Sequence, residues 1–331
     1  MGKILIIAEA GVNHNGDIDM AKEMIRVAKD AGADIVKFQT SNLDSLVAKS
    51  AKMAEYQKEN TGQDIPQKEM LKKITLPFED FVVLKDYCDE VGIRFLSTPF
   101  CLDSVRFLDG LQDLWKIPSG EITNYPYLVM IAHTHKPIIL STGMSTMDEV
   151  RAAVKLLRDE GSGEITLLHC TTDYPTRDED VNLKAMQTLA RELECPVGYS
   201  DHTRGIDISI AAVGMGAVVI EKHFTLDRSL PGPDHKASLE PDELRELVKG
   251  IRRVEVALGT GEKKPAEGEK KNKAIARKSI VAKTDIRKGD ILTEENITTK
   301  RPGDGVSAML WPQVLGTAAI RDFNEDELIE I

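Results

Sequence analysis

The chain has few cysteines, no excess of positive charge and no long hydrophobic run, and each absence excludes a class of protein. Its four cysteines form no CxxC pair, which argues against a zinc cluster or redox motif and favours reduced thiols. The formal net charge of −11 argues against nucleic acid or an anionic membrane as a partner. The apolar run 4–8 ends at Glu9 and is too short for a signal peptide or a membrane span. We therefore expect a cytoplasmic globular protein.

Short apolar runs alternate with amphipathic helical patterns over the first 260 residues. The strand candidates are 3–11, 34–40, 93–100, 114–120, 137–143, 164–170, 196–203 and 217–224. The stretches 20–32, 147–161, 182–194 and 241–259 carry apolar residues at helical spacing, and several of them end at glycine. Eight such units over roughly 250 residues predict a (β/α)₈ TIM barrel. An open doubly wound sheet is the alternative, but no GxGxxG follows the first strand.

Two further segments do not fit the simple repeat. Residues 41–77 are longer than a crossover needs, and we expect an extra helix near the barrel mouth. After the barrel at 1–260, the polar, lysine-rich residues 261–277 are predicted to be a linker. Short period-two runs broken by glycine, aspartate and proline then predict a small β-rich domain at 278–331. A domain of roughly 55 residues has a marginal core, so we expect it to be stabilised by packing against another surface.

In a barrel of this kind, functional groups gather at the carboxyl ends of the strands. The polar residues there are Glu9, Lys37, Gln39, Thr98, Lys116, Ser119, Glu121, Ser141, Ser200, Asp201, His202, Glu221 and His223. His202 and His223 follow neighbouring strands, so their imidazoles can converge on one divalent cation. Alternatively, each histidine hydrogen-bonds a nearby carboxylate. The matched positions favour a metal, and Mn²⁺ or Mg²⁺ over Zn²⁺, because no third histidine or cysteine accompanies them.

Lysines at the ends of apolar strands also call for a partner. Lys37 and Lys116, with the hydroxyls of Thr98, Ser119 and Ser141, predict a site for a phosphate or carboxylate, because buried ammonium groups are costly without an anion. The alternative pairs each lysine with a glutamate. Candidates for proton transfer, or for holding a nucleophilic water, are Glu9, Glu121 and Glu221.

The chain resembles the sialic acid (nonulosonate) synthase family. The matching segments, in order, are IIAEAGVNHNGD, VKFQT, FLSTPF, KIPSGEITN, ILSTGM, GYSDHT, EKHFT, GPDHKASLEP and KRPGDG. The family condenses phosphoenolpyruvate with an N-acylated hexose to make a nine-carbon sugar acid, and the tail from about Lys278 resembles its antifreeze-like (SAF, β-clip) domain. The HCTTDYP segment, with threonine at 172 where acetylneuraminate synthases have asparagine, is more similar to N,N′-diacetyllegionaminate synthases. Their substrate is 2,4-diacetamido-2,4,6-trideoxy-mannose; the alternative is N-acetylmannosamine, which gives N-acetylneuraminate.

The resemblance also implies a role for each matched residue. A divalent metal, usually Mn²⁺ with Mg²⁺ or Co²⁺ as alternatives, would be held by His202 and His223. Phosphoenolpyruvate would be bound by Lys37, Thr98, Lys116, Ser119, Ser141 and Ser200. The sugar would contact Gln39, Tyr174 and Asp234, together with Arg301 reaching in from a partner subunit, which implies a domain-swapped homodimer. Two rival functions are a metal-dependent aldolase that uses pyruvate and, from the tail domain alone, a carbohydrate- or ice-binding protein.

Overall fold

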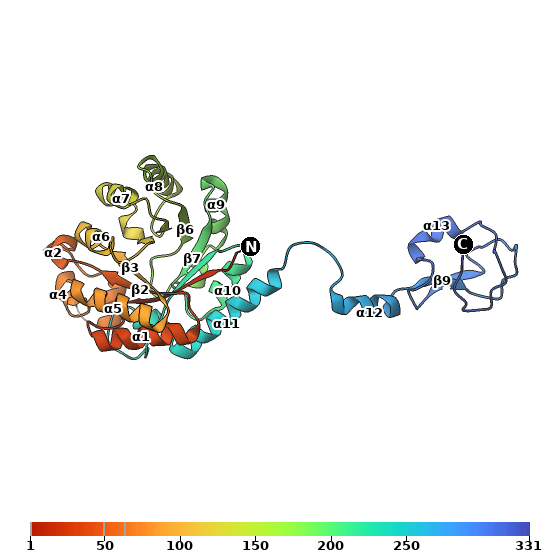
Figure 1. The fold of residues 1–331 in the computed structure, drawn as a ribbon, viewed down its shortest axis with the longest axis horizontal. Helices are drawn as coiled ribbons and strands as arrows, with labels where there is room; N and C mark the ends of the chain where they lie inside the picture. The colour runs from red at the N-terminus through yellow and green to blue at the C-terminus, as the bar shows by residue number, and fades with distance from the viewer. Residues whose placement is uncertain (1, 49, 63) are drawn as a thin grey trace. The chain divides into compact units, whose positions relative to one another are not determined.

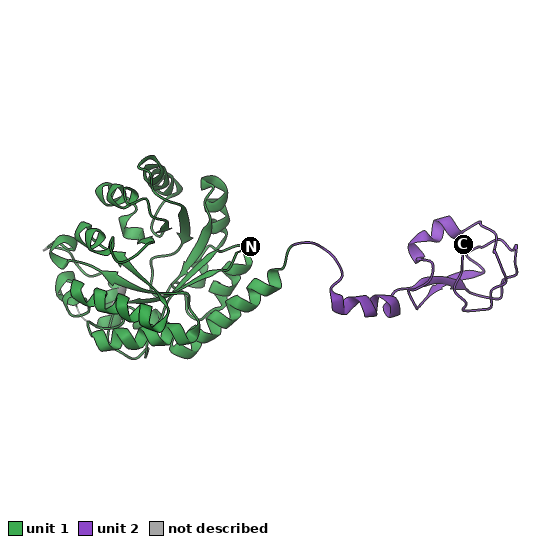
Figure 2. Ribbon diagram, viewed as in Figure 1, with its two compact units in different colours: residues 1–260 green, residues 261–331 purple. Residues whose placement is uncertain are grey.

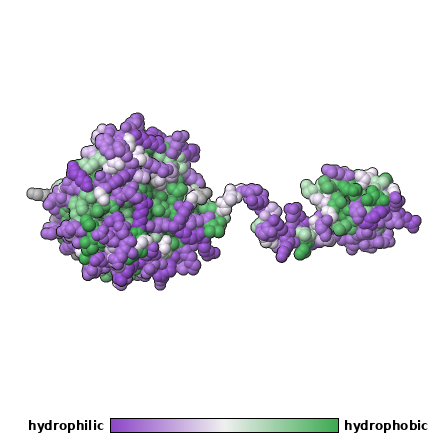
Figure 3. Space-filling model, viewed as in Figure 1, coloured by the Kyte–Doolittle hydropathy of each residue, from purple (hydrophilic) through white to green (hydrophobic). Residues whose placement is uncertain are grey.

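The computed structural model describes residues 2–48, 50–62 and 64–331, which form two compact units (Figure 2). The first unit extends to Thr260 and the second comprises Gly261–Ile331. Figure 3 shows that hydrophilic residues cover most of the visible face of the first unit. None of the helices in the described part of the chain has the length and apolarity that a membrane crossing requires.

The first unit is a barrel of eight parallel strands, which confirms the predicted (β/α)₈ fold (Figure 1). The strands are β1 Leu5–Gly11, β2 Ile35–Thr40, β3 Arg94–Pro99, β4 Trp115–Ile117, β5 Ile138–Ser141, β6 Ile165–His169, β7 Val197–Asp201 and β8 Val219–His223. They are hydrogen-bonded in the order β3-β2-β1-β8-β7-β6-β5-β4. At the remaining seam, between β3 and β4, the side-chain amide of Gln112 bonds both backbone groups of Ser97, at 2.8 and 3.1 Å. Every strand lies inside a segment that the sequence predicts.

Helices surround the strands and shield their outer faces from water. They are α1 Ile18–Ala31, α5 Phe78–Val91, α6 Leu102–Leu108, α7 Tyr125–Ala132, α8 Met147–Asp159, α9 Lys184–Leu193, α10 Asp207–Gly214 and α11 Pro241–Leu258. Helix α1 illustrates how the local sequence starts, orients and ends these helices. The Asp17 side chain caps its first amides, Met24 and Ile25 lie on its buried face, and Gly32 ends it with a φ of 86°, a conformation that suits glycine.

In its described residues, the segment between β2 and α5 forms three short helices at the barrel mouth rather than one. They are α2 Leu43–Leu46, α3 Glu55–Thr61 and α4 Gln67–Lys72. A small apolar cluster of Val12, Met53, Met70 and Ile74 attaches them to the barrel. The side-chain amide of Asn60 also donates to the carbonyl oxygen of Pro233 at 2.6 Å. This segment is therefore fastened to the loop after β8 across the mouth.

The interior of the barrel is filled by one aliphatic layer. Seven residues, each from a different strand or its first flanking position, form it: Ile7, Ile35, Leu96, Leu114, Ile139, Leu168 and Val219. The remaining strand, β7, contributes Gly198. A Cβ atom there would lie 2.3 Å from the carbonyl oxygen of Val219 and 2.7 Å from Cδ2 of Leu168. The layer therefore has no room for an eighth side chain.

The second unit is small and carries its own core. It contains α12 Glu267–Ala276, the antiparallel pair β9 Ser279–Ala282 and β10 Ile297–Lys300, and α13 Trp311–Val314. Its core residues are Ile280, Ala282, Ile286, Leu292, Ile297, Val314, Ala319, Phe323 and Ile329. Helix α12 lies inside the stretch 261–277 that is predicted to be a linker. Alanine, glutamate and lysine favour helix there, and the Glu269 carboxylate accepts from the Ala266 N–H at 2.8 Å.

Candidate active site

A cavity of about 350 Å³ opens at the carboxyl ends of the barrel strands. Part of its polar lining, which includes both lysines and both buried glutamates, follows the aliphatic layer by two residues on the same strand, as Glu9 follows Ile7 and Lys37 follows Ile35. Successive strand side chains point to opposite faces, so residues two apart face the same interior. The predicted site residues that line the cavity are Glu9, Lys37, Gln39, Thr98, Lys116, Ser119, Ser141, Tyr174, Ser200, His202, Glu221, His223 and Asp234.

Two buried lysines and two buried glutamates form the floor of the cavity. The Nζ atom of Lys37 lies 2.7 Å from Oε2 of Glu9, donates to Oγ1 of Thr98 at 3.0 Å, and lies 3.7 Å from Oε2 of Glu221. The Nζ atom of Lys116 donates to Oγ of Ser141 at 2.6 Å and lies 3.8 Å from Oε1 of Glu221. Glu221 therefore lies between two ammonium groups, and Ser200 donates a hydrogen bond to it at 2.9 Å.

The pKa values of the two glutamates diverge because their charged neighbours differ. Burial acts to raise the pKa of Glu221, but Lys116 and Lys37 together hold it at about 2. Burial raises the pKa of Glu9 in spite of the opposing charge of Lys37. Glu221 is thus a permanent anion at neutral pH. Glu9 is the carboxylate better matched to proton transfer, since an acid–base group works best when its pKa approaches the working pH.

Two neutral imidazoles face this floor. The Nδ1–H of His202 donates to the carbonyl oxygen of Thr171 at 2.6 Å, so its Nε2 carries the lone pair. Nδ1 of His223 is buried and has no hydrogen-bond partner in the structure. The ring centroids are 5.6 Å apart, and burial lowers the pKa of both, that of His202 to about 4. Nε2 of His202 has only a long contact, 3.4 Å, with the Ser200 hydroxyl. Neutral imidazoles placed in this way are suited to a divalent cation.

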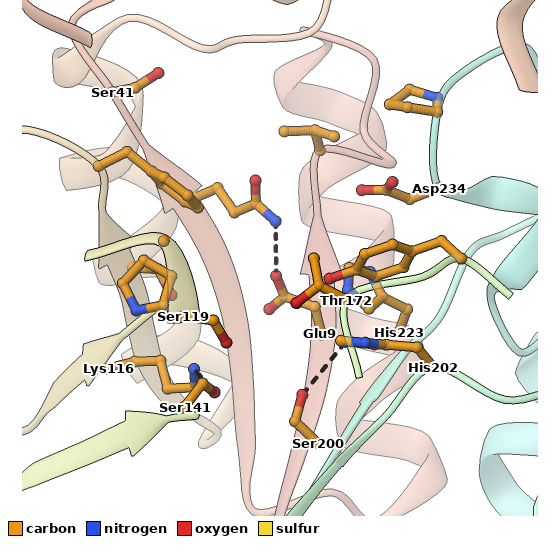
Figure 4. Close-up of a pocket in the computed structure, with 18 of the residues that line it drawn as sticks. Glu9, Ser41, Lys116, Ser119, Ser141, Thr172, Ser200, His202, His223 and Asp234 are labelled. Atoms are coloured by element: carbon orange, nitrogen blue, oxygen red, sulfur yellow. Dashed lines mark hydrogen bonds between the residues drawn. The ribbon is translucent and has the colours of Figure 1, made fainter. Parts of the chain in front are cut away.

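The arrangement of these groups around the cavity is visible in Figure 4. Lys116, Ser119 and Ser141 lie on one side, His202, His223 and Thr172 lie opposite them, and Glu9 is between. In the described residues, no three histidine, cysteine, aspartate or glutamate side chains are grouped closely enough to hold a metal. A cation held by the two imidazoles would therefore keep positions for water and substrate oxygens.

The outer part of the cavity combines a buried carboxylate with an apolar wall. Asp234 is 8% exposed, and burial, with a smaller effect of the Glu9 charge, raises its pKa to about 7. The segment 41–77 contributes Leu46, Val47, Leu71 and Ile74 to the lining. The Tyr174 ring packs against the His202 ring, with centroids 4.1 Å apart. Sequence reasoning missed the apolar wall, although the excess length of 41–77 was its signal.

Glu121 and Arg301 are the two predicted site residues that are not in this lining. Glu121 is in the 3₁₀ turn η1 Ser119–Glu121, does not line the cavity, and accepts a hydrogen bond from the side chain of Asn124. The turn after β4 brings Ser119 to the rim and directs Glu121 away, so we withdraw Glu121 as a catalytic candidate. Arg301 lies in the second unit, where its Nε donates to the carbonyl oxygen of Ala276 at 3.1 Å.

Comparison with known proteins finds relatives of both units of the chain. Residues 24–263 match the NeuB family, and residues 277–330 match the SAF domain. An N,N′-diacetyllegionaminic acid synthase of Campylobacter jejuni is 53% identical over 332 residues, 99% of each chain. A protein of the same name from Legionella pneumophila is 50% identical, over 94% of this chain and 89% of that one. The crystal structure of a Leptospira borgpetersenii N-acetylneuraminic acid synthetase is 36% identical, with a TM-score of 0.72 over 82% of this chain and 90% of that one.

Proposed function

The chain belongs to the NeuB family, and we propose that it condenses phosphoenolpyruvate with 2,4-diacetamido-2,4,6-trideoxy-mannose to give N,N′-diacetyllegionaminate and phosphate. The observation that carries this proposal is a single cavity in which two buried lysines face two neutral imidazoles. The lysines suit a small phosphorylated acid, and the imidazoles suit a cation that can accept a sugar oxygen.

Phosphoenolpyruvate would be held on the floor of the cavity. The ammonium groups of Lys37 and Lys116 supply positive charge, and the hydroxyls around them supply directional hydrogen bonds. These hydroxyls belong to Thr98, Ser119, Ser141 and Ser200. Glu9 and Glu221 offset the lysine charges in the free enzyme, so a multiply charged substrate needs further positive charge nearby. Such a need is consistent with a divalent cation.

That cation would be held by His202 and His223, with Mn²⁺ the first choice and Mg²⁺ or Co²⁺ as alternatives. When bound, it would polarise the aldehyde oxygen of the sugar. The hydrogen bond from His202 to the Thr171 carbonyl orients the ring and leaves the lone pair on Nε2, which lies 3.4 Å from the Ser200 hydroxyl. The buried rings also keep their lone pairs unprotonated at neutral pH, because burial lowers both pKa values.

Carbon–carbon bond formation joins the methylene carbon of phosphoenolpyruvate to the aldehyde carbon, and the aldehyde oxygen takes up a proton to become a hydroxyl. Positive charge develops at the oxygen-bearing carbon of the enol, and water adds there with loss of one proton. The tetrahedral species then loses phosphate by C–O cleavage and its remaining hydroxyl proton, which leaves the keto group. Glu9 would orient that water and accept its proton, because the raised pKa makes its carboxylate the better base of the pair. Glu221, fixed between the lysines and Ser200, would keep both ammonium groups aligned.

The choice of sugar is supported by sequence identity and by the apolar wall. Identity is 53% to a diacetyllegionaminic acid synthase and 36% to an N-acetylneuraminic acid synthetase. Leu46, Val47, Leu71 and Ile74 offer no hydrogen-bonding side chain, which suits the C6 methyl group and acetyl methyls of the deoxy sugar. N-acetylmannosamine, the alternative, would bring a C6 hydroxyl that none of these four side chains can hydrogen-bond. The same segment, 41–77, also lines the cavity with Ser41, Gln57, Gln67 and Thr75, which can bond the polar groups of either sugar.

Phosphate release in the presence of Mn²⁺ tests the proposal. Offered each sugar with phosphoenolpyruvate, the enzyme should release phosphate faster with the diacetamido sugar. A higher rate with N-acetylmannosamine would establish the alternative activity. Product formation from pyruvate, without phosphate, would establish the aldolase instead.

We also propose that the enzyme works in the cytoplasm as a domain-swapped homodimer in which Arg301 contacts the sugar in the partner's barrel. Mixing inactive Arg301→Ala and His202→Ala variants tests this arrangement, because a mixed dimer would contain one site with both residues intact. Recovery of activity on mixing and subunit exchange is expected. If the mixture remains as inactive as either variant, the shared site is excluded.

A further inference from the structure

A buried ion pair lies directly behind the two imidazoles, on the other face of the barrel wall. Asp201 and Lys222 are register partners on β7 and β8, and each is 1% exposed. Their neighbours Ser200 and Glu221 face the cavity, so Asp201 and Lys222 point outward toward α10. The Nζ atom of Lys222 lies 2.9 Å from Oδ2 of Asp201. Neither residue lines the cavity, and no step proposed above uses them.

The pair holds the backbone immediately after His202. Oδ1 of Asp201 accepts from both the backbone N–H and the hydroxyl of Thr203, each at 2.8 Å. Nζ of Lys222 donates to the carbonyl oxygen of Thr203 at 2.6 Å. Oδ2 of Asp201 also accepts from the hydroxyl of Ser209 in α10, at 2.5 Å. Residue 203 is therefore held at both of its backbone groups, and the arrangement is anchored to a helix.

This arrangement matters for His202 because β7 ends at Asp201. His202 lies one position beyond the strand. Its carbonyl oxygen accepts from the Thr176 N–H at 2.8 Å, but the residue that follows it is outside the ladder of strand hydrogen bonds. Lys222 immediately precedes His223, and its ammonium group bonds the carbonyl oxygen of Thr203, which immediately follows His202. One side chain therefore connects the two histidine-bearing segments. A buried ion pair is a poor source of net stability, since desolvation offsets much of its attraction. A contribution to stability is therefore a weak explanation for why this ion pair is buried and bonded to both backbone groups of Thr203.

We propose that Asp201 and Lys222 are positioning residues that set the spacing of the His202 and His223 imidazoles, and thereby the affinity of the site for a divalent cation. The inference rests on the metal role proposed for the two histidines. Groups that orient metal ligands typically change metal affinity by about 10- to 100-fold when removed. A pair that only supported the fold would change stability and leave the affinity unaltered.

The test is direct titration of the full-length protein with Mn²⁺, with the free ion followed by electron paramagnetic resonance and the Tm measured in parallel. Lys222→Met keeps the aliphatic stem and removes the charge, and should raise the Kd for Mn²⁺ by about 10- to 100-fold. Thr203→Val removes the hydroxyl that donates to Asp201, with its longer contact to the Arg204 carbonyl, and should raise the Kd by a smaller factor. Should Lys222→Met fail to fold, Thr203→Val and the double variant Asp201→Asn/Lys222→Met, which leaves no buried charge, decide the question.

A matched control comes from the opposite end of the barrel. Arg252 donates to the carbonyl oxygen of Ile4 at 2.8 Å and to the Asp34 carboxylate at 2.6 Å, far along β1 from the cavity-lining Glu9. Arg252→Met should lower the Tm and leave the Kd unchanged. If the Lys222 and Thr203 variants bind Mn²⁺ as tightly as the parent while their Tm falls, the positioning role is wrong and the synthase proposal stands. If the parent itself binds no Mn²⁺, the metal role fails and this inference fails with it.

Discussion

Two layers of side chains inside the same barrel differ in polarity and in how tightly they are packed. The lower layer is aliphatic and so full that β7 can place only Gly198 there. Two residues further along the strands, the upper layer carries lysines, glutamates and hydroxyls around a cavity of about 350 Å³. The period-two geometry of a strand aims both layers inward. The lower layer therefore supplies stability, and the upper layer can hold costly buried charges in positions that suit a substrate.

The largest effect should come from removing a predicted metal ligand in the upper layer. His202→Ala is expected to lower kcat/KM by about 1,000-fold or more, because the aldehyde would lose its polarising partner. The Tm should change little, since the lower layer is untouched. Phosphate release and thermal unfolding measure the two effects. Full activity of the variant in chelator-treated buffer would contradict the metal role.

The converse experiment disturbs the packing of the lower layer. Leu168→Ala should lower the free energy of unfolding by about 2–5 kcal/mol, through lost burial and the void left behind. Gly198→Ala should also destabilise, by about 1–3 kcal/mol, because its Cβ would lie 2.3 Å from a carbonyl oxygen. Denaturant titration measures both. If either variant lost activity at native stability, the division of labour between the layers would be wrong.

A smaller effect is expected at the apolar wall. Ile74→Ser should shift the ratio of kcat/KM for the two candidate sugars by about 10-fold toward N-acetylmannosamine, because a hydroxyl then faces the sugar's C6 hydroxyl. The KM for phosphoenolpyruvate should stay constant, which serves as the internal control. An unchanged sugar ratio would show that discrimination resides elsewhere in the cavity.

A pH-dependent effect is expected at Asp234, whose pKa in the folded protein is about 7 against an ordinary value of 3.8. The folded state binds this proton more tightly than the unfolded state, so stability falls as pH rises from about 4 to about 7 and stays lower above that range. Asp234→Asn should therefore raise the Tm by several degrees at pH 8 and hardly at all at pH 4. An equal gain at both pH values would assign the effect to packing rather than to charge.

Particular residues show where sequence reasoning succeeded and where it stopped. Lys37, Lys116, His202 and His223 could be placed at one barrel mouth because each follows an apolar strand. Asp201 satisfies the same rule and yet faces the opposite side of the wall. Glu121 follows β4 in sequence, but the turn η1 directs it away from the cavity. The side of the barrel wall to which a side chain points depends on strand register and turn geometry, and position at a strand end alone does not specify either.

The sequence by itself determined the number and order of the strands, and the approximate position at which each changes from aliphatic to polar. These properties are encoded locally, in runs and periodicities of a few residues. Only the tertiary structure decided that Glu221 lies between two lysines, that Nδ1 of His223 has no partner, and that Asp201 and Lys222 hold the backbone beyond His202. Each of these depends on distances between residues far apart in the chain, and barrel closure is what sets those distances.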